Sequence, residues 1–234
     1  MTATNQMPSM LNNYIGALLG SRKRFRAGQK IPALSLQASA IQIDHRHIAR
    51  YNRICGYSDD TFIAPTYLQV LAFPLQVGMM VKREFPIPLL GVVHVRNSIE
   101  MHSSLQTNMH FDLSVSVSQH RTVAKGVEVD LLTEASSHGN LVWRSLATML
   151  YRCKTDVAEA PKSQSEPQID TNQQQWTLCT GLGRDYGIAS GDINPIHLSA
   201  LTARIFGFER AIAHGMWCKA RCLAALEGIL PAPP

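Results

Sequence analysis

The chain has 234 residues, with 22 Lys and Arg against 17 Asp and Glu, so its formal net charge is +5. With 45% hydrophobic and 17% charged residues it can bury a core, which excludes a disordered tail, a collagen-like repeat and a coiled coil. The five cysteines include no CxxC pair. Neither a disulfide framework nor a zinc ribbon is therefore indicated, and a reducing compartment is the simpler interpretation.

No apolar run approaches the roughly 20 residues that a membrane span requires, and the N-terminus lacks the features of a secretory signal. We therefore expect a cytoplasmic protein without a membrane span. The first acidic residue is Asp44, and a basic cluster at residues 22–26 precedes it, a composition that transit peptides share. Organelle import is thus the alternative. No aromatic-interleaved basic face and no known reader motif accompany this cluster, so we expect no nucleic acid partner.

The first third of the chain has mainly helical patterns. Residues 10–19 and 45–55 are expected to form helices, and residues 31–43 between them an extended segment. Residues 66–83 form a long apolar stretch of helical length. Pro74 is expected to kink or divide that helix, because proline removes a backbone donor.

The hydrophobic period then changes to two. Apolar and polar residues alternate over residues 111–118, which is typical of a strand with one wet face. Similar runs at residues 90–101, 126–132 and 141–152 predict at least four strands joined by short connections, which favours an antiparallel sheet. Helices followed by a sheet indicate an α+β fold.

A second unit is expected after a linker. Residues 154–175 contain Pro, Ser and Gln without apolar periodicity, which predicts an exposed linker. The second unit begins near Trp176 with a short strand to Cys179.

The second unit repeats part of the first at a constant offset. The matched pairs are Tyr51 with Tyr186, Cys55 with Ser190, and Gly56 with Gly191. The same offset places Tyr57 opposite Asp192 and Phe62 opposite His197. If one copy is chemically active, it is therefore the second.

Residues 190–197, with the sequence SGDINPIH, are the most informative segment. Asn194 can cap a helix and Pro195 suits its first position, so a helix is expected to run to about Phe206 and to stop at Gly207.

On this interpretation His197 lies in the first helical turn and Asp192 in the loop before it, so both side chains can reach one small volume. A helix N-terminus disfavours the imidazolium, and a neutral imidazole can accept a proton. The aspartate beside it can hold a water molecule or exchange a proton. Together the two residues are candidates for acid–base catalysis.

A second element begins with AHGMW at residues 213–217 and predicts a buried helix that ends before Gly228. Gly215 near its start lets a ligand approach free N–H groups, where the helix dipole favours negative charge. This is the pattern of an oxyanion hole. An acid–base pair facing such amides suits the addition of water to a double bond conjugated to a carbonyl, and this chemistry requires no metal and no redox cofactor.

Tyr186, residues 190–197 and residues 213–216 together resemble the signature of the MaoC-like, or hydratase 2, family of (R)-specific enoyl-CoA hydratases. The resemblance implies hotdog folds, in which an antiparallel sheet wraps a central helix, and a thioester substrate carried on CoA or acyl carrier protein. It also implies that Asp192 and His197 are the catalytic pair and that the Gly215 amide contributes to the oxyanion site.

The resemblance further implies a double hotdog whose inactive first half helps to accommodate the acyl chain. The expected divisions are an N-terminal helix and basic arm at 1–38, a degenerate hotdog at 39–153, the linker at 154–175, and a partial hotdog with the catalytic motif at 176–234. A complete hotdog needs several strands after its central helix, but only residues 229–234 follow here. The second hotdog is therefore expected to be incomplete, and its apolar helix to be buried against the first unit or against another chain, as in a homodimer.

Three functions are open at this point. The first is hydration of trans-2-enoyl thioesters to (R)-3-hydroxyacyl thioesters, or the reverse dehydration, in fatty acid metabolism. The alternative is a non-catalytic subunit that binds acyl thioesters. A thioesterase is a remote third option, by analogy of fold alone.

Other polar residues near the motif have two explanations each. Ser190 and Asn194 can orient the catalytic pair, or they can serve only to form the turn. His214 can line the site, or it can be a satisfied core histidine.

Two pairs outside the motif have structural explanations. His45 and His47 are expected on a solvated helix face rather than in a metal site, because no partner cluster accompanies them. Cys218 and Cys222 share a helix face and are expected to pack in the core.

Overall fold

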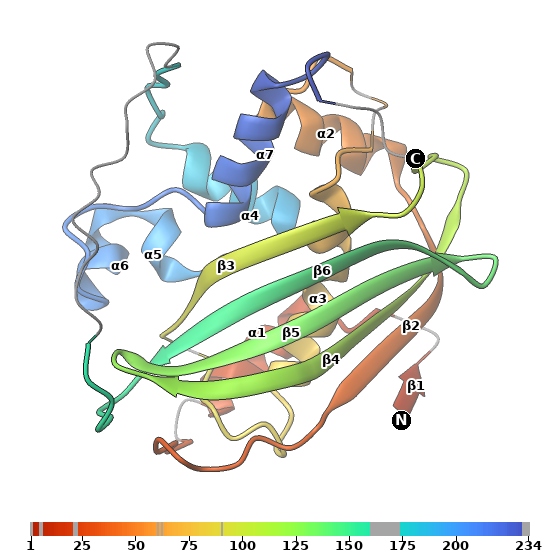
Figure 1. The fold of residues 1–234 in the computed structure, drawn as a ribbon. Helices are drawn as coiled ribbons and strands as arrows, with labels where there is room; N and C mark the ends of the chain where they lie inside the picture. Colours follow the sequence, from red (N-terminus) through yellow and green to blue (C-terminus); the bar gives the residue numbers. More distant parts are fainter. Residues whose placement is uncertain are drawn as a thin grey trace.

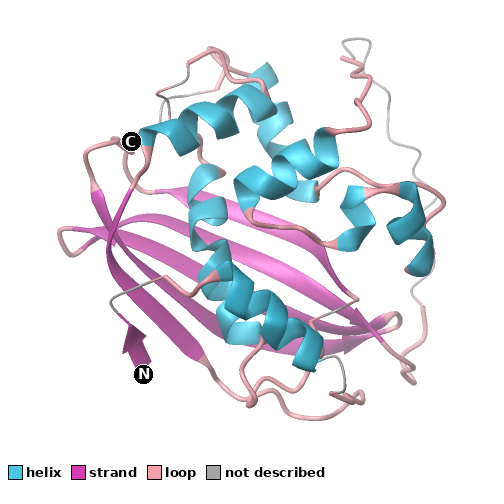
Figure 2. Ribbon diagram, turned by 180° about the vertical axis from the view of Figure 1, so that it is seen from behind, coloured by secondary structure: helices cyan, strands magenta, loops and turns pink. Residues whose placement is uncertain are grey.

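The structure is a computed structural model that describes residues 2–4, 7–20, 23–59, 61, 63–89, 91–159 and 174–230. A six-stranded sheet has the order β1-β2-β4-β5-β6-β3. Its strands are β1 (Thr2–Thr4), β2 (Ser35–Gln42), β3 (Val92–Met101), β4 (His110–Val123), β5 (Gly126–Ser137) and β6 (Asn140–Arg152). The helices cover one face of this sheet and leave the other open (Figures 1 and 2).

Five of the strands form an antiparallel sheet, and β1 joins its edge parallel to β2. Two-residue turns join β4 to β5 and β5 to β6. In the second turn His138 and Gly139 both have positive φ, as a type I′ hairpin turn requires. The expected antiparallel sheet is confirmed; β4 and β5 extend beyond the runs that the sequence pattern marked, whereas β3 begins two residues later than expected.

The described residues form seven helices: α1 (Met10–Leu19), α2 (His45–Cys55), α3 (Tyr67–Met80), α4 (Leu182–Ser190), α5 (Pro195–Leu198), α6 (Ala200–Ile205) and α7 (Gly215–Ala225). Helix α3 lies against the inner face of the sheet, where its buried Gln76 donates to Thr133 Oγ1 at 2.8 Å. The fully buried Trp143 donates to the Pro65 carbonyl just before α3, also across this interface, at 2.7 Å. A sheet packed around α3 is a hotdog-like arrangement.

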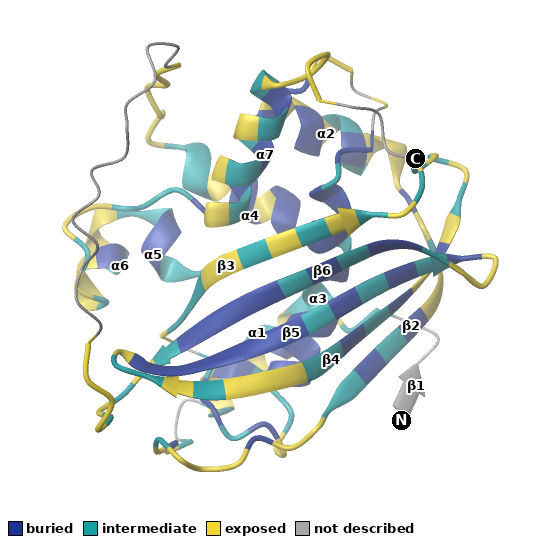
Figure 3. Ribbon diagram, viewed as in Figure 1, coloured by how far each residue is buried: buried dark blue, intermediate teal, exposed yellow. Residues whose placement is uncertain are grey.

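The two faces of the sheet differ in chemistry, as the period-two pattern requires. Leu131 and Ala135 of β5 belong to the core between the sheet and the helices. Glu128 and Asp130 alternate with them, and Arg121 pairs with both carboxylates. These ion pairs cover the outer face, so β5 is buried along nearly its whole length (Figure 3).

Pro74 does not divide α3, which runs as one helix from Tyr67 to Met80. Of the two outcomes expected at Pro74, a kink or a division, division of the helix does not occur. The apolar packing of α3 against the sheet outweighs the single backbone hydrogen bond that proline removes. Asn13 of α1 adds a further contact at this position by donating to the Pro74 carbonyl at 2.8 Å.

All regular elements of the described C-terminal segment are helices, and no strand occurs within residues 174–230. The short strand expected from Trp176 to Cys179 is wrong, because this stretch is exposed and irregular. The Arg221 guanidinium lies 4.9 Å from the Trp176 ring centroid and holds the segment against α7.

The single helix expected between Asn194 and Phe206 is divided at Ser199. Ser199 has extended backbone angles, and its side chain accepts a hydrogen bond from the Thr202 amide. It therefore ends α5 and caps α6, a use of serine that competes with helix continuation.

The internal repeat has a structural counterpart. Helices α2 and α4 both end at a left-handed glycine, with φ of 82° at Gly56 and 77° at Gly191. The rings of Tyr51 and Tyr186 lie 6.1 Å apart between centroids. Tyr57 is buried, whereas Phe62 lies outside the described residues.

Some expectations concern parts that the structure describes only partly. Residues 160–173 of the expected linker and Arg22 of the basic cluster lie outside the described residues. Among the described helices, none has the length and apolar character to cross a membrane.

Candidate active site

Residues from both the N-terminal and the C-terminal halves of the chain line a cavity of about 550 Å³. One wall consists of apolar side chains of α3, including Val70, Phe73 and Val77. The other contains the loop after α4 and the start of α7, with Asp192 among its polar groups. A mostly apolar pocket with a few convergent polar groups is the usual form of a small-molecule site.

Asp192 lies in the loop between α4 and α5, and its neighbours fix its position. The Asp192 amide donates to Ser190 Oγ at 3.2 Å, and its Oδ1 accepts from the Asn194 amide at 3.2 Å. Asn194 Oδ1 in turn accepts from the Ile196 amide and caps α5, as predicted. Ser190 and Asn194 therefore both form the turn and hold the aspartate.

His197 is buried in α5, and its ring has one nitrogen engaged. Nδ1 lies 2.7 Å from the Ile212 carbonyl oxygen. A carbonyl oxygen can only accept, so Nδ1 carries a proton, and in the neutral ring the lone pair is on Nε2. This tautomer is the one that a general base on Nε2 needs.

Gly183 explains how α4 and α5 can pack so closely at this point. A Cβ atom at Gly183 would lie 1.8 Å from the His197 carbonyl oxygen. Only glycine fits there without moving the backbone of His197.

His214 occupies the N-cap position of α7 without a side-chain capping bond and is nearly fully buried. Its Nε2 donates to the Asp192 carbonyl oxygen at 2.8 Å, and its ring stacks on that of His197 at 3.7 Å. Burial is the main cause that lowers the pKa of His214 to about 4. The charge of Asp192 acts to raise this pKa, and the charge of His197 acts to lower it. His214 is thus neutral at pH 7 and both lines the cavity and holds the backbone of Asp192.

Potential ligand atoms of Asp192, His197 and His214 all lie within 4.8 Å of one another, a donor set that a metal such as zinc can use. The geometry favours acid–base chemistry over chelation. Because the two imidazoles are stacked, their in-plane lone pairs run side by side rather than toward one point. His214 Nε2 is also already committed to the Asp192 carbonyl.

Gly215 is the first residue of α7 and lines the same cavity. A Cβ atom built there would meet no other atom within 4 Å, so the space in front of its backbone is open. The first N–H groups of a helix lack partners within the helix and carry its positive dipole end. The start of α7 therefore has the electrostatic character that favours an oxygen with negative charge.

The expectations outside the motif are met only in part. His45 is exposed, as expected, but His47 is half-buried, and its ring nitrogens contact Tyr67 OH at 2.8 Å and the Ala189 carbonyl at 2.7 Å. Cys218 and Cys222 are exposed, because α7 buries its opposite face.

Two cavity residues escaped the sequence analysis. His94 of β3 lines the cavity, and burial lowers its pKa. Tyr14 of α1 also lines it and contacts the loop around Asp192. Neither lies near a recognisable motif, and only the tertiary fold brings them to the site.

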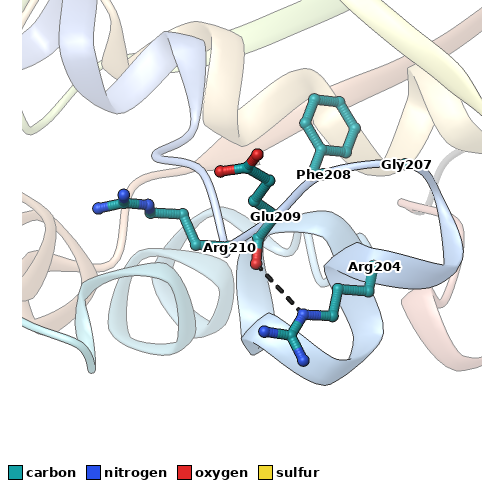
Figure 4. Close-up of a pocket in the computed structure, with 5 residues that line it drawn as sticks. All are labelled: Arg204, Gly207, Phe208, Glu209 and Arg210. Carbon is teal, nitrogen blue, oxygen red and sulfur yellow. Dashed lines mark hydrogen bonds between the residues drawn. The ribbon is translucent and has the colours of Figure 1, made fainter.

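A second hollow, of about 530 Å³, lies on the loop after α6 (Figure 4). Arg204 and Arg210 line it, but their guanidinium groups point in different directions, and Arg204 Nε is directed to the Glu209 carbonyl oxygen at 3.4 Å. This hollow therefore lacks convergent groups. The fold and the larger cavity together define a hotdog-like protein with a candidate acid–base pair beside an apolar pocket.

Comparison with known proteins agrees with this class. Residues 162–232 match the family model of the MaoC like domain. A curated relative from Mycobacterium tuberculosis, 3-hydroxyacyl-thioester dehydratase X, is 27% identical over 226 residues, which cover 96% of this chain and 81% of the relative. A crystal structure of HtdX from the same organism has a TM-score of 0.74 and 27% identity, and the match covers 84% of this chain and 80% of that chain.

A MaoC-like dehydratase from Phytophthora capsici shares the fold, with a TM-score of 0.64 and 18% identity over 86% of this chain and 75% of that chain. The resemblance to the MaoC-like family is confirmed by the match of residues 162–232 to the model of the MaoC like domain. The name of the Mycobacterium tuberculosis relative describes a dehydratase of 3-hydroxyacyl thioesters.

Proposed function

We propose that this protein hydrates trans-2-enoyl thioesters to (R)-3-hydroxyacyl thioesters, or catalyses the reverse dehydration. The observation that carries the proposal is the convergence of Asp192, His197 and the start of α7 on one side of an apolar cavity. The name of the relative, 3-hydroxyacyl-thioester dehydratase X, points to the same chemistry.

In the hydration direction a water molecule binds between Asp192 and His197. The lone pair of His197 Nε2 takes one proton from this water, and the hydroxide forms a bond to Cβ of the enoyl group. The carboxylate of Asp192 holds the water and stabilises the imidazolium.

The electrons of the Cα–Cβ double bond move toward the thioester oxygen, which becomes an enolate oxygen. The Gly215 amide and the dipole of α7 stabilise this oxygen. The proton held by the Asp192–His197 pair then passes to Cα. One water has been added and the pair returns to its starting state, and dehydration follows the same steps in reverse.

The apolar part of the cavity takes the acyl chain, while CoA or acyl carrier protein stays outside. A cavity of about 550 Å³ has room for roughly 18 groups of the volume that one water occupies in the liquid. The side chains of α3 that line it belong to the N-terminal half, which therefore serves to accommodate the chain.

We further propose a double-hotdog architecture, with a degenerate first unit at 39–153 and a partial second unit at 176–234. The paired left-handed glycines that end α2 and α4 support the relation between the units. The lack of a strand within the described residues 174–230 supports the partial character of the second. A homodimer, a cytoplasmic location and a role in fatty acid metabolism stay predictions from the sequence.

The test uses the full chain and trans-2-enoyl-CoA substrates of increasing length. We expect the absorbance of the conjugated thioester to fall, chiral analysis to give the (R)-3-hydroxyacyl product, and no free thiol to form. Release of a free thiol would instead identify a thioesterase. Binding without turnover would identify a non-catalytic subunit that binds acyl thioesters.

A further inference from the structure

The hydroxyl of Tyr14 contacts the backbone on both sides of Asp192, although the two residues lie at opposite ends of the chain. It donates to the Gly191 carbonyl oxygen. It also accepts from the Ile193 amide at 2.8 Å. One side chain of α1 thus spans the peptide units that flank the proposed acid–base residue.

The loop also has hydrogen-bond partners from nearby, and the Ile193 amide donates to the Gly191 carbonyl oxygen at 3.2 Å as well as to Tyr14. Ser190 Oγ accepts from the Asp192 amide, and His214 donates to the Asp192 carbonyl. Tyr14 is the partner that comes from the N-terminal part of the chain. Backbone groups at a loop without regular structure need such partners to keep one conformation.

Helix α1 is itself held firmly against α3. The buried Asn13 donates to the Pro74 carbonyl at 2.8 Å. A Cβ atom at Gly16 would lie 3.1 Å from Val81 Cβ, so the two segments are in close contact. Ala17 of the same helix lines the cavity. Tyr14 therefore connects a wall of the cavity to the catalytic loop.

We propose that Tyr14 is a positioning residue that holds Asp192 in its working position through the two flanking peptide units. The inference rests on the proposed function for its effect on rate. Tyr14 is not a catalytic residue, because its hydroxyl proton is donated to the Gly191 carbonyl and its oxygen accepts from the Ile193 amide.

The ionisation of Tyr14 agrees with a purely positioning role. Burial raises its pKa to about 12; the Ile193 amide acts to lower it and the negative charge of Asp192 to raise it. The hydroxyl therefore stays protonated at neutral pH and can donate and accept at the same time.

The test compares wild type with Tyr14→Phe and with Tyr51→Phe as a matched control. Tyr51 also has a buried hydroxyl, which donates to Thr66 Oγ1 at 2.9 Å, but it does not line the cavity. Two quantities are measured well below the melting temperature of each protein: kcat and KM for enoyl-CoA hydration, and amide hydrogen exchange of the peptide that contains residues 191–194.

In Tyr14→Phe we expect exchange in this peptide to rise at least tenfold and kcat to fall about 10- to 100-fold, since small misplacements of a reacting group cost rates of this size. KM is expected to change less than threefold, and the control to leave both quantities near wild type. Unchanged exchange in Tyr14→Phe, or a loss of kcat no greater than in the control, would overturn the proposal. If wild type has no turnover, the proposed function fails, while exchange alone still decides whether Tyr14 holds the loop.

Discussion

Acidification from pH 7 to pH 5 is expected to destabilise the fold through His214. The imidazole is buried, stacked on His197 and bonded through Nε2 to the Asp192 carbonyl. Burial lowers its pKa from 6.5 to about 4. Between these two values the unfolded chain binds a proton at this residue and the folded protein does not, so stability is complete above pH 6.5 and is lost as the pH falls.

The size of the effect follows from the two pKa values of His214. One pKa unit corresponds to 1.36 kcal/mol, so the full loss is about 3 kcal/mol and is reached below pH 4. Between pH 7 and pH 5 the loss is about 2 kcal/mol. Domains of this kind are stable by only about 5–15 kcal/mol, so the change is easily measured.

The assay is urea unfolding of wild type and His214→Gln at pH 7 and pH 5. Glutamine can still donate to the Asp192 carbonyl but does not titrate, and every other histidine is common to both proteins. Wild type is expected to lose about 2 kcal/mol more than the variant on acidification. An equal loss in the two proteins would refute the reasoning.

Two further substitutions test the packing around the site and the sheet. In Gly183→Ala the new Cβ would lie 1.8 Å from the His197 carbonyl oxygen, so we expect a loss of hydration rate of about 100-fold or more. Gly181→Ala, which would meet only side-chain atoms at 3.6 Å or more, serves as its control, and equal rates in the two variants would contradict the prediction. Arg121→Ala leaves the buried Asp130 without its ion pair and is expected to cost about 2 kcal/mol in urea unfolding; a cost below about 0.5 kcal/mol, the range of an ordinary surface change, would show that the pair contributes little.

Much of the fold could be predicted because its patterns are local. The helices at 10–19 and 45–55 begin and end as expected, and the alternation in residues 111–118 marks β4. The division of the expected C-terminal helix at Ser199 escaped prediction, because a serine side chain competes with the helix backbone only in a suitable tertiary setting. At Pro74 the local sequence allowed a division of the helix that does not occur, since packing against the sheet keeps α3 continuous.

The motif at 190–197 placed Asp192 and His197 in one loop and the adjoining helical turn, where the structure has them. It did not indicate the tautomer of His197, which depends on the Ile212 carbonyl fifteen residues later. It also did not indicate Tyr14, whose contacts cross nearly the whole chain. Periodicity and motifs describe short segments, and such distant partners follow only from the folded arrangement.

The most direct test of the central claim is kcat/KM for hydration of trans-2-enoyl-CoA in wild type, Asp192→Asn, His197→Gln and the double variant. If the two residues act as one acid–base unit, each single variant loses at least about 100-fold, and the double variant is little worse than either. Single variants that keep the wild-type rate, or losses that multiply in the double variant, would contradict the account.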